Sequence, residues 1–284
     1  MKHNRHPILV QIYDSLKDLY TREELKSLSK IICEDLLKIN YLSLYLDKDI
    51  IISEKQKKEL SSILNRLQQS EPIQYITGQA EFMGHIFNVA DGVLIPRAET
   101  ELLVDIIIKR ESKATRILDV GTGSGCIAIS LCKGIVGSYV EAWDVSSEAL
   151  KIAEGNNLKN NSSVVFKQID LFNVSPTDSL FDLIVSNPPY ITEKERIGMD
   201  RNVLDWEPDL ALFVPNNDPL IYYRKIAEIS KSLLHENGVL YFEINRLFGK
   251  EIVVMLKNMG YSNVELMQDF YHCDRFIRAE KWVQ

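Results

Sequence analysis

The chain has 284 residues, of which 45% are hydrophobic, and carries a net charge of −7 at pH 7. This length and apolar content are sufficient for one large or two modest globular domains, which argues against a disordered chain. No apolar stretch reaches the length of a membrane span, and the first residues lack the apolar core and cleavage site of a signal peptide. We therefore expect a cytoplasmic protein without a membrane anchor.

The acidic excess lies in the later part of the chain. Residues 1–70 hold 12 Lys and Arg against 10 Asp and Glu, whereas the rest holds 21 of the 33 basic residues and 30 of the 40 acidic ones, a balance of −9. A surface that grips DNA or RNA must neutralise many phosphates and therefore needs the opposite sign. We expect no direct nucleic-acid binding by this part.

The four cysteines and five histidines are too widely scattered for a zinc site or a redox dithiol. We expect the cysteines to be reduced and structural, and we expect no metal ion.

Apolar residues recur at spacings of three and four through the first 70 residues, which predicts a small all-α domain over 1–70. Thr21 and Glu24 have the spacing of a capping box, and Ser53 is placed to cap the third helix. From 71 to 95, short alternating pieces are broken by prolines and glycines, which predicts a hairpin or two as a connector.

The last domain is expected over residues 96–284, and strands and helices alternate from residue 116 onwards. This pattern predicts an α/β domain with a parallel, doubly wound sheet, helices on both faces and an antiparallel pair at the end. The expected strands are RILDV, YVEAWDV, VVFKQID, FDLIVSN, GVLYFEI, VELMQ and RFIRAE, with helices from Glu99, after Gly125, and over 147–157, 219–235 and 249–259.

The stretch ILDVGTGSGCIAIS places Gly121, Gly123 and Gly125 in the turn between the first of these strands and its helix. Open parallel sheets bind ligands at this position, and glycine lets the backbone approach a ligand closely. The third glycine of a dinucleotide fingerprint is missing, because Cys126 stands in its place. A tight strand-to-helix turn without a ligand is the alternative for this motif alone.

Two acidic residues end the following strands at the same edge of the predicted sheet. Asp144 lies near the offset at which a carboxylate accepts from the hydroxyls of a ribose, although it could instead cap the next helix, a role open also to Ser146 or Ser147. Asp170 could accept a hydrogen bond from an adenine amino group, with Leu171 and Phe172 flanking the ring. Together with the glycine turn, these strand ends favour an adenosine ligand.

The acidic surroundings favour S-adenosyl-L-methionine (SAM) over a dinucleotide. SAM has no pyrophosphate to cradle, and its cationic sulfonium and amino-acid tail suit nearby carboxylates. Asp119, just before the glycines, could hold the ammonium group of that tail or merely cap the turn. We therefore predict SAM as the cofactor.

The segment SNPPY follows the strand FDLIV. Proline fixes its own φ and favours an extended preceding residue, so Asn187, Pro188 and Pro189 are expected to form a stiff loop. Because neither proline has an N–H, the loop offers the Asn187 side-chain oxygen and the Pro188 carbonyl as acceptors without competing donors.

Two fixed acceptors would orient an NH₂ group on a planar carbon so that its nitrogen faces the methyl group. Positioning of this kind supplies on the order of 7 kcal/mol of a reaction barrier. Tyr190 is expected to stack on the planar group or to wall the methyl channel. A rigid surface turn is the alternative for the motif.

These motifs resemble those of the HemK/PrmC protein-(glutamine-N5) methyltransferases, which act on peptide chain release factors. The resemblance spans essentially the whole chain and is carried, in order, by EPIQYITG, VLIPRAETELLVD, ILDVGTGSGCIAIS, WDVSSEAL, IVSNPPYI and WEPDLAL. It implies a SAM-dependent enzyme that methylates the glutamine of the release factor's Gly-Gly-Gln motif. We expect the helical domain to help recognise this protein substrate, and we expect a monomer.

The resemblance also implies roles for individual residues. The implied cofactor contacts are Gly121, Thr122, Gly123, Ser124, Gly125, Asp144, Asp170, Leu171 and Asn187, together with Arg97, Glu99 and Thr100 in a segment that lies over the cofactor. The implied substrate contacts are Asn187, Pro188, Pro189 and Tyr190, of which Asn187, Pro188 and Tyr190 would be catalytic.

The chain departs from the family pattern at Ala98, at the stretch ALFVPNNDPL, and at Asn245 and Phe248. We expect these departures to leave the NPPY chemistry untouched, whereas the resemblance does not extend to the detail of the cofactor lid and the outer substrate groove.

Two other functions remain open on the sequence. An adenine-N6 methyltransferase of DNA or RNA shares the NPPY motif, because an exocyclic adenine amine presents the same two hydrogens. It would need base extrusion and phosphate contacts, which the acidic balance disfavours. A non-catalytic SAM-binding scaffold would have no need of the acceptor loop.

Overall fold

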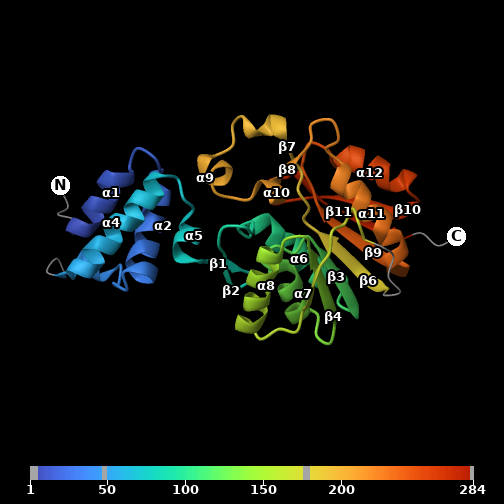
Figure 1. Ribbon diagram of the computed structural model, residues 1–284, viewed down its shortest axis with the longest axis horizontal. Coiled ribbons are helices and arrows are strands. Elements are labelled where there is room, and N and C mark those ends of the chain that lie inside the picture. The colour runs from blue at the N-terminus through green and yellow to red at the C-terminus, as the bar shows by residue number, and fades with distance from the viewer. Residues whose placement is uncertain (1–5, 47–49, 175–179, 282–284) are drawn as a thin grey trace. The chain divides into compact units, whose positions relative to one another are not determined.

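The computed structural model describes residues 6–46, 50–174 and 180–281 (Figure 1). The chain divides into two compact units: the first is Met1–Gly78 with Asp200–Trp206, and the second is Gln79–Met199 with Glu207–Gln284. The division into 1–70, 71–95 and 96–284 stays a prediction, and it did not anticipate the return of residues 200–206 to the first unit. No helix within the described residues combines the length and apolarity that crossing a membrane requires.

The first unit is helical, as the periodicity predicts. Its helices are α1 (Pro7–Leu16), α2 (Arg22–Ile31) with a π-helical continuation η1 (Ile32–Leu36), α3 (Ser43–Leu46), α4 (Glu54–Gln68), α5 (Ile73–Thr77) and α9 (Arg201–Leu204). Their apolar stripes enclose a core that includes Ile12, Leu16, Ile32 and Leu60. Thr21 and Glu24 form the predicted capping box, and Ser53 caps α4 as expected.

The segment EPIQYITG differs from its prediction. Residues 73–77 form the short helix α5, which ends at Gly78 in the left-handed region with φ +72°. A hairpin of β1 (Gln79–Phe82) and β2 (His85–Asn88) follows. Pro72 and Gly78 bound a helical turn here rather than a strand, because proline is compatible with a helix start and glycine with a helix end.

The second unit is built on a seven-stranded sheet in the order β10-β11-β9-β6-β3-β4-β5. The five parallel strands are β3 (Arg116–Val120), β4 (Tyr139–Asp144), β5 (Val165–Gln168), β6 (Phe181–Ser186) and β9 (Leu234–Glu243). The antiparallel pair β10 (Tyr261–Gln268) and β11 (Asp274–Lys281) closes one edge. The predicted α/β fold class is confirmed.

Helices cover both faces of this sheet (Figure 1). One core lies under α6 (Ala98–Arg110), α7 (Cys126–Gly134) and the β1–β2 hairpin, and the other lies under α11 (Ile221–Leu233) and α12 (Gly249–Asn258). Successive strand residues point to opposite faces, so Ile117 belongs to the first core and Leu118 to the second. α8 (Ser147–Lys159) packs on β2, β4 and β5.

Several short elements lie outside the predicted pattern. They are β7 (Ile191–Thr192), η2 (Glu193–Arg196), α10 (Asp209–Leu212) and β8 (Phe213–Val214), and β7 pairs with β8. Elements of two to four residues are too short to show a periodicity in sequence.

Asp119 is fully buried near the end of β3, directly before the glycine turn. Its Oδ2 accepts a hydrogen bond from Thr122 Oγ1 at 2.7 Å, and its Oδ1 makes no hydrogen bond of good geometry. Burial raises the pKa of Asp119 to about 7, although the hydrogen bond from Thr122 opposes this shift. Of its two expected roles, the geometry favours capping of the turn.

Substitution Asp119→Asn should change how stability depends on pH. Because the pKa of Asp119 is raised in the folded protein, the folded state holds a proton that the unfolded state releases above about pH 4. Between pH 5 and 7 the free energy of unfolding of the wild type should therefore fall relative to that of the variant, by on the order of 1.4 kcal/mol per pH unit. Denaturant titrations across this range measure the difference.

Asp182→Asn provides the control. Burial raises the pKa of Asp182, but hydrogen bonds from Thr115 and Arg116 outweigh it and lower the pKa overall, so this carboxyl is ionised in both states above pH 5. The difference in unfolding free energy between Asp182→Asn and the wild type should therefore not change from pH 5 to 7. If the difference for Asp119→Asn is also independent of pH, the pKa of Asp119 is not raised.

Candidate active site

A cavity of about 470 Å³ opens in the second unit at the carboxyl ends of β3, β4 and β6. Here β3 is flanked by β4 on one side and β6 on the other, which makes this edge a topological switch point of the sheet. The predicted site residues that line the cavity are Arg97, Thr100, Gly121, Thr122, Gly123, Ser124, Asp144, Asp170, Leu171, Asn187, Pro188 and Pro189. Glu99, Gly125 and Tyr190 are not among its lining residues.

The three glycines of the turn have different roles. Gly121 and Gly123 have φ of +76° and +53°, and a Cβ added to either would meet nothing within 4 Å. They therefore present bare backbone to open space beside the cavity. Gly125 has φ +81°, but an added Cβ would lie 3.1 Å from the Cβ of Ala153 in α8. Its absent side chain thus permits helix packing.

Asp144 holds the glycine turn. Its Oδ2 accepts from the Gly123 amide at 2.8 Å and its Oδ1 from the Ser146 amide at 2.9 Å. The N-cap of α8 is Ser146, whose hydroxyl oxygen accepts from the Ala149 amide at 3.1 Å. Ser146, and not Asp144, therefore caps α8. Each Asp144 oxygen keeps a lone pair that can accept from a ligand hydroxyl.

The lining chemistry fits SAM. The carboxylates of Asp144, Glu148 and Asp170 border the cavity, and its lining also includes Phe172, whose ring meets Tyr222 edge to face at 5.6 Å between centroids. The hydroxyl of Ser124 is buried and has no hydrogen-bond partner. No lysine occurs among the described residues that line the cavity. Bare backbone, carboxylates and flat apolar rings suit a cation with an adenosine group better than a pyrophosphate.

The carboxylate of Asp170 also fixes its own turn. Its Oδ1 accepts from the Phe172 amide at 2.9 Å and its Oδ2 from Asn173 at 2.6 Å. Asp119, by contrast, is buried behind the turn and is not a lining residue.

Arg97 lies over the cavity in the segment before α6. Its guanidinium donates to Glu207, a buried residue that also accepts from the Ile95 amide at 3.2 Å. Among the described residues that line the cavity, Arg97 is the only Lys or Arg, and Glu207 neutralises its charge. Glu207 belongs to the WEPDLAL motif, and its partner could not be read from the sequence.

The acceptor loop is held on both sides. Before it, the Ser186 hydroxyl donates to the Val120 carbonyl at 2.6 Å. After it, the Tyr190 amide donates to the Leu212 carbonyl at 3.2 Å. Asn187, Pro188 and Pro189 therefore reach the cavity from a loop that is anchored at both ends.

A hydrogen-bonded network lies behind Asn187. Its Nδ2 donates to Thr100 Oγ1 at 3.3 Å, Thr100 Oγ1 donates to Glu243 Oε2 at 2.7 Å, and the Tyr190 hydroxyl donates to Glu243 Oε1 at 3.2 Å. Glu243 is 1% exposed, and burial raises its pKa. Glu243 is not among the predicted site residues, because its only signal in the sequence is a carboxylate at the end of the apolar strand GVLYFEI.

Tyr190 lies next to the cavity-lining residue Pro189 but is not itself a lining residue. Its hydroxyl is turned toward Glu243, away from the cavity, although part of the side chain remains exposed. Stacking of its ring on a substrate stays a prediction.

That the departures leave the NPPY chemistry untouched stays a prediction, but one of them, Asn245, contacts the NPPY loop. This residue is 4% exposed, and its Nδ2 donates to the Tyr190 carbonyl at 3.0 Å and to both Glu195 oxygens at 3.1 Å. The Asn245 side chain thus braces the loop. Sequence could not show this, because the contact joins segments about 50 residues apart.

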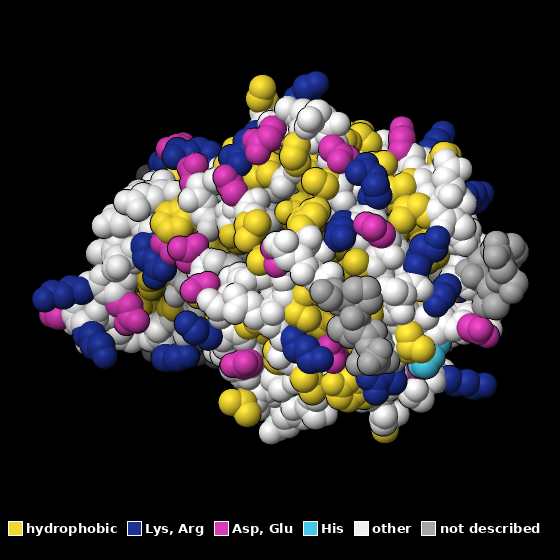
Figure 2. Space-filling model, turned by 45° about the vertical axis from the view of Figure 1, so that its right-hand side comes forward, with side chains coloured by type: hydrophobic (Ala, Val, Ile, Leu, Met, Phe, Trp, Pro, Cys, Tyr) yellow, Lys and Arg dark blue, Asp and Glu magenta, His cyan; other side chains and the backbone are white. Residues whose placement is uncertain are grey.

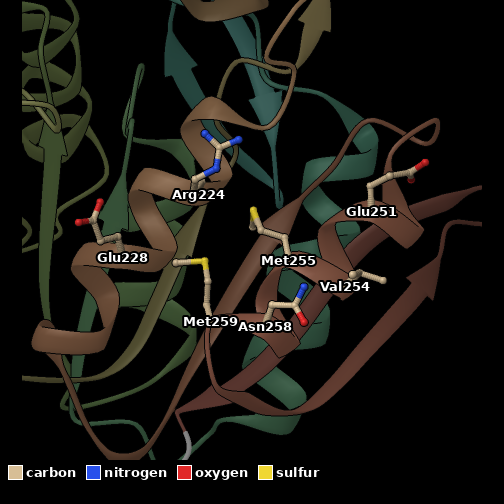
Figure 3. Close-up of a pocket in the computed structure, with 7 residues that line it drawn as sticks. All are labelled: Arg224, Glu228, Glu251, Val254, Met255, Asn258 and Met259. Carbon is tan, nitrogen blue, oxygen red and sulfur yellow. The ribbon is translucent and has the colours of Figure 1, made fainter.

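A second cavity, of about 540 Å³, lies between α11 and α12 (Figure 3). Its lining residues are Arg224, Glu228, Glu251, Val254, Met255, Asn258 and Met259. Arg224 already pairs with Asp218 at 2.8 Å, and none of the motif residues lies here. We assign it no function.

The surface charges are mixed. Figure 2 shows Lys and Arg side chains interspersed with Asp and Glu over the face in view. Among the described residues, no three His, Cys, Asp or Glu side chains gather in a way that could hold a metal ion. The absence of a metal requirement stays a prediction.

Comparisons with known proteins agree with the fold and with the motifs. Residues 98–203 match the methyltransferase small domain, and residues 8–78 match the PrmC N-terminal domain. Two solved structures share the fold: a methyltransferase from Pyrococcus furiosus (TM-score 0.54, 17% identity, covering 78% of this chain and 100% of that one) and the T. thermophilus 16S rRNA N2 G1207 methyltransferase (TM-score 0.50, 15% identity, covering 72% and 50%).

Curated relatives match almost from end to end. The release factor glutamine methyltransferase of Bacteroides thetaiotaomicron is 50% identical over 275 residues, which cover 96% of this chain and 99% of the relative. That of Flavobacterium psychrophilum is 41% identical over 274 residues, covering 95% and 96%. The cofactor of this methyltransferase fold is SAM. The chain therefore belongs to the family of release factor glutamine methyltransferases.

Proposed function

We propose that this protein transfers a methyl group from SAM to the side-chain nitrogen of the glutamine in the Gly-Gly-Gln motif of peptide chain release factors. The observation that carries the proposal is the position of Asn187 and Pro188, which border the same cavity as the glycine turn. The names of the relatives support the same substrate class.

In this proposal, the loop orients the nucleophile. The side-chain oxygen of Asn187 and the carbonyl of Pro188 each accept one hydrogen of the glutamine NH₂ group, and neither Pro188 nor Pro189 has an N–H that would compete. A carboxamide nitrogen is a weak nucleophile, and donating both hydrogens increases its electron density. Bound SAM supplies a methyl group on a positively charged sulfur.

The reaction needs no general base. The amide nitrogen becomes acidic as it attacks the methyl group, so it loses its proton without the help of a basic side chain. Correct placement then lowers the barrier, in the way that well-oriented intramolecular reactions gain on the order of 7 kcal/mol.

The cofactor contacts are proposed on the same grounds. Gly121 and Gly123 offer bare backbone, Asp144 offers free lone pairs for the ribose hydroxyls, and Asp170 with Leu171 borders the place for the adenine. We also propose that the first unit helps recognise the release factor, and that the enzyme acts as a monomer in the cytoplasm, where translation takes place.

Labelling tests the proposed activity. With methyl-labelled SAM and an unmodified release factor, label should enter the peptide that contains Gly-Gly-Gln. Asn187→Ala should lower the single-turnover rate at least ~100-fold, because the amide nitrogen loses a positioning acceptor, while SAM affinity measured by calorimetry stays within a few-fold. The control Asn258→Ala, in the second cavity, should leave the rate unchanged.

The outcomes separate the candidate functions. Label in DNA or RNA instead of protein would favour the adenine-N6 alternative. If an active, unmodified release factor acquires no label from the folded enzyme, the proposed function is wrong.

Asp144→Asn should weaken SAM binding. Replacing a charged acceptor by a neutral amide costs about 1.5–3 kcal/mol when it removes a hydrogen bond, which corresponds to a Kd roughly 10- to 100-fold higher. Asp182→Asn is a matched control, because Asp182 also accepts from backbone amides, at 2.8 and 3.0 Å, but is not a cavity residue. Equal Kd values for the two variants would remove Asp144 from the cofactor site.

A further inference from the structure

We infer that Thr100 and Glu243 determine which way round the side-chain amide of Asn187 faces, and that they are positioning residues for the methyl transfer. The inference rests on the proposed function, because it explains how the acceptor of that reaction is presented.

The requirement arises from the near-symmetry of an amide group. The oxygen and nitrogen of an asparagine side chain have almost the same size, so rotation by 180° exchanges them at little steric cost. In one orientation the Asn187 oxygen faces the incoming NH₂ group and accepts from it. In the other orientation the Asn187 NH₂ faces the incoming NH₂ group, and two donors repel each other. Something other than shape must select the productive orientation.

The hydroxyl of Thr100 makes this selection. It has a single hydrogen, which it donates to Glu243 Oε2 at 2.7 Å. Toward Asn187, at 3.3 Å, it can therefore present only lone pairs, so Asn187 must turn its Nδ2 to Thr100. The amide oxygen is left for the opposite side, and Asn187 borders the cavity.

Glu243 fixes the direction of the Thr100 hydrogen. Both carboxylate oxygens accept, one from Thr100 and one from the Tyr190 hydroxyl at 3.2 Å. Burial raises the pKa of Glu243, whereas these two hydrogen bonds and the charge of Arg275 lower it and the charge of Glu99 raises it. Because the side chain is 1% exposed, water does not replace either donor. As a carboxylate, Glu243 has no hydrogen to donate, so it can only accept from the hydroxyls of Thr100 and Tyr190.

The backbone places the residues of this network next to one another. Ser186 in β6 pairs with Phe242 in β9, so Asn187 and Glu243 follow at the same level of the sheet. Thr100 comes from the first turns of α6, and Tyr190 is three residues after Asn187. The acceptor loop thus contributes both the group that is oriented and one donor that holds the orienting carboxylate.

The test removes the Thr100 hydroxyl and keeps its shape. Thr100→Val should lower the single-turnover rate of release factor methylation about 10- to 100-fold, the size of effect that small misplacements cause. The KM for release factor and the Kd for SAM should stay within about threefold. Thr100→Ser, which restores the hydroxyl, should recover the rate to within about threefold of the wild type.

Two controls separate positioning from a structural effect. Thr115→Val deletes another hydroxyl-to-carboxylate hydrogen bond, of 2.8 Å to Asp182, and should leave the rate unchanged. In an Asn187→Ala background, Thr100→Val should cause no further loss, because residues that act through one another are not additive.

The results are decisive in either direction. If the wild type labels release factor but Thr100→Val is equally fast, or its loss multiplies in the Asn187→Ala background, the inference is wrong while the proposed function stands. A Thr100→Val variant with normal rate and a Kd for SAM raised about tenfold would assign Thr100 to the cofactor instead. An inactive wild type would overturn the proposed function itself.

Discussion

The parallel register of four neighbouring strands is the constraint on which the site depends. Val120 pairs with both Trp143 and Ser186, and Ser186 pairs with Phe242. The next residue of each strand is therefore placed at one level of the sheet edge: a glycine, Asp144, Asn187 and Glu243. The backbone register thus makes neighbours of residues that are separated by more than 120 positions in sequence.

Most of the fold and part of the site could be predicted, because their signals are local. Continuous apolar runs indicate buried parallel strands, and glycine and proline act through their own backbone geometry. Glu243 and Asn245 could not be predicted in this way: each lies in an ordinary strand end or loop, and its importance comes from a partner more than 50 residues away. The direction of the Tyr190 hydroxyl has the same origin.

The carboxylates at this edge of the sheet have different roles according to their surroundings. Asp119 is enclosed behind the turn with one short hydrogen bond, and its pKa is raised to about 7 by burial. Asp144 is partly exposed and accepts from two backbone amides. Glu243 has a hydroxyl on each oxygen. In each case the acid organises neighbouring atoms, which suits a reaction in which placement matters more than proton transfer.

The return of residues 200–206 to the first unit makes that unit discontinuous along the chain. Trp206 donates from its indole nitrogen to the Gln69 carbonyl at 3.1 Å, whereas the adjacent Glu207 is fixed to Ile95 and Arg97 in the second unit. No single cleavage of the backbone can therefore yield the helical unit intact. A fragment that starts after Gly78 would still contain residues 200–206, including Val203, Leu204 and Trp206, without the rest of the unit to which they belong. A fragment designed to isolate the second unit should therefore also have this segment shortened.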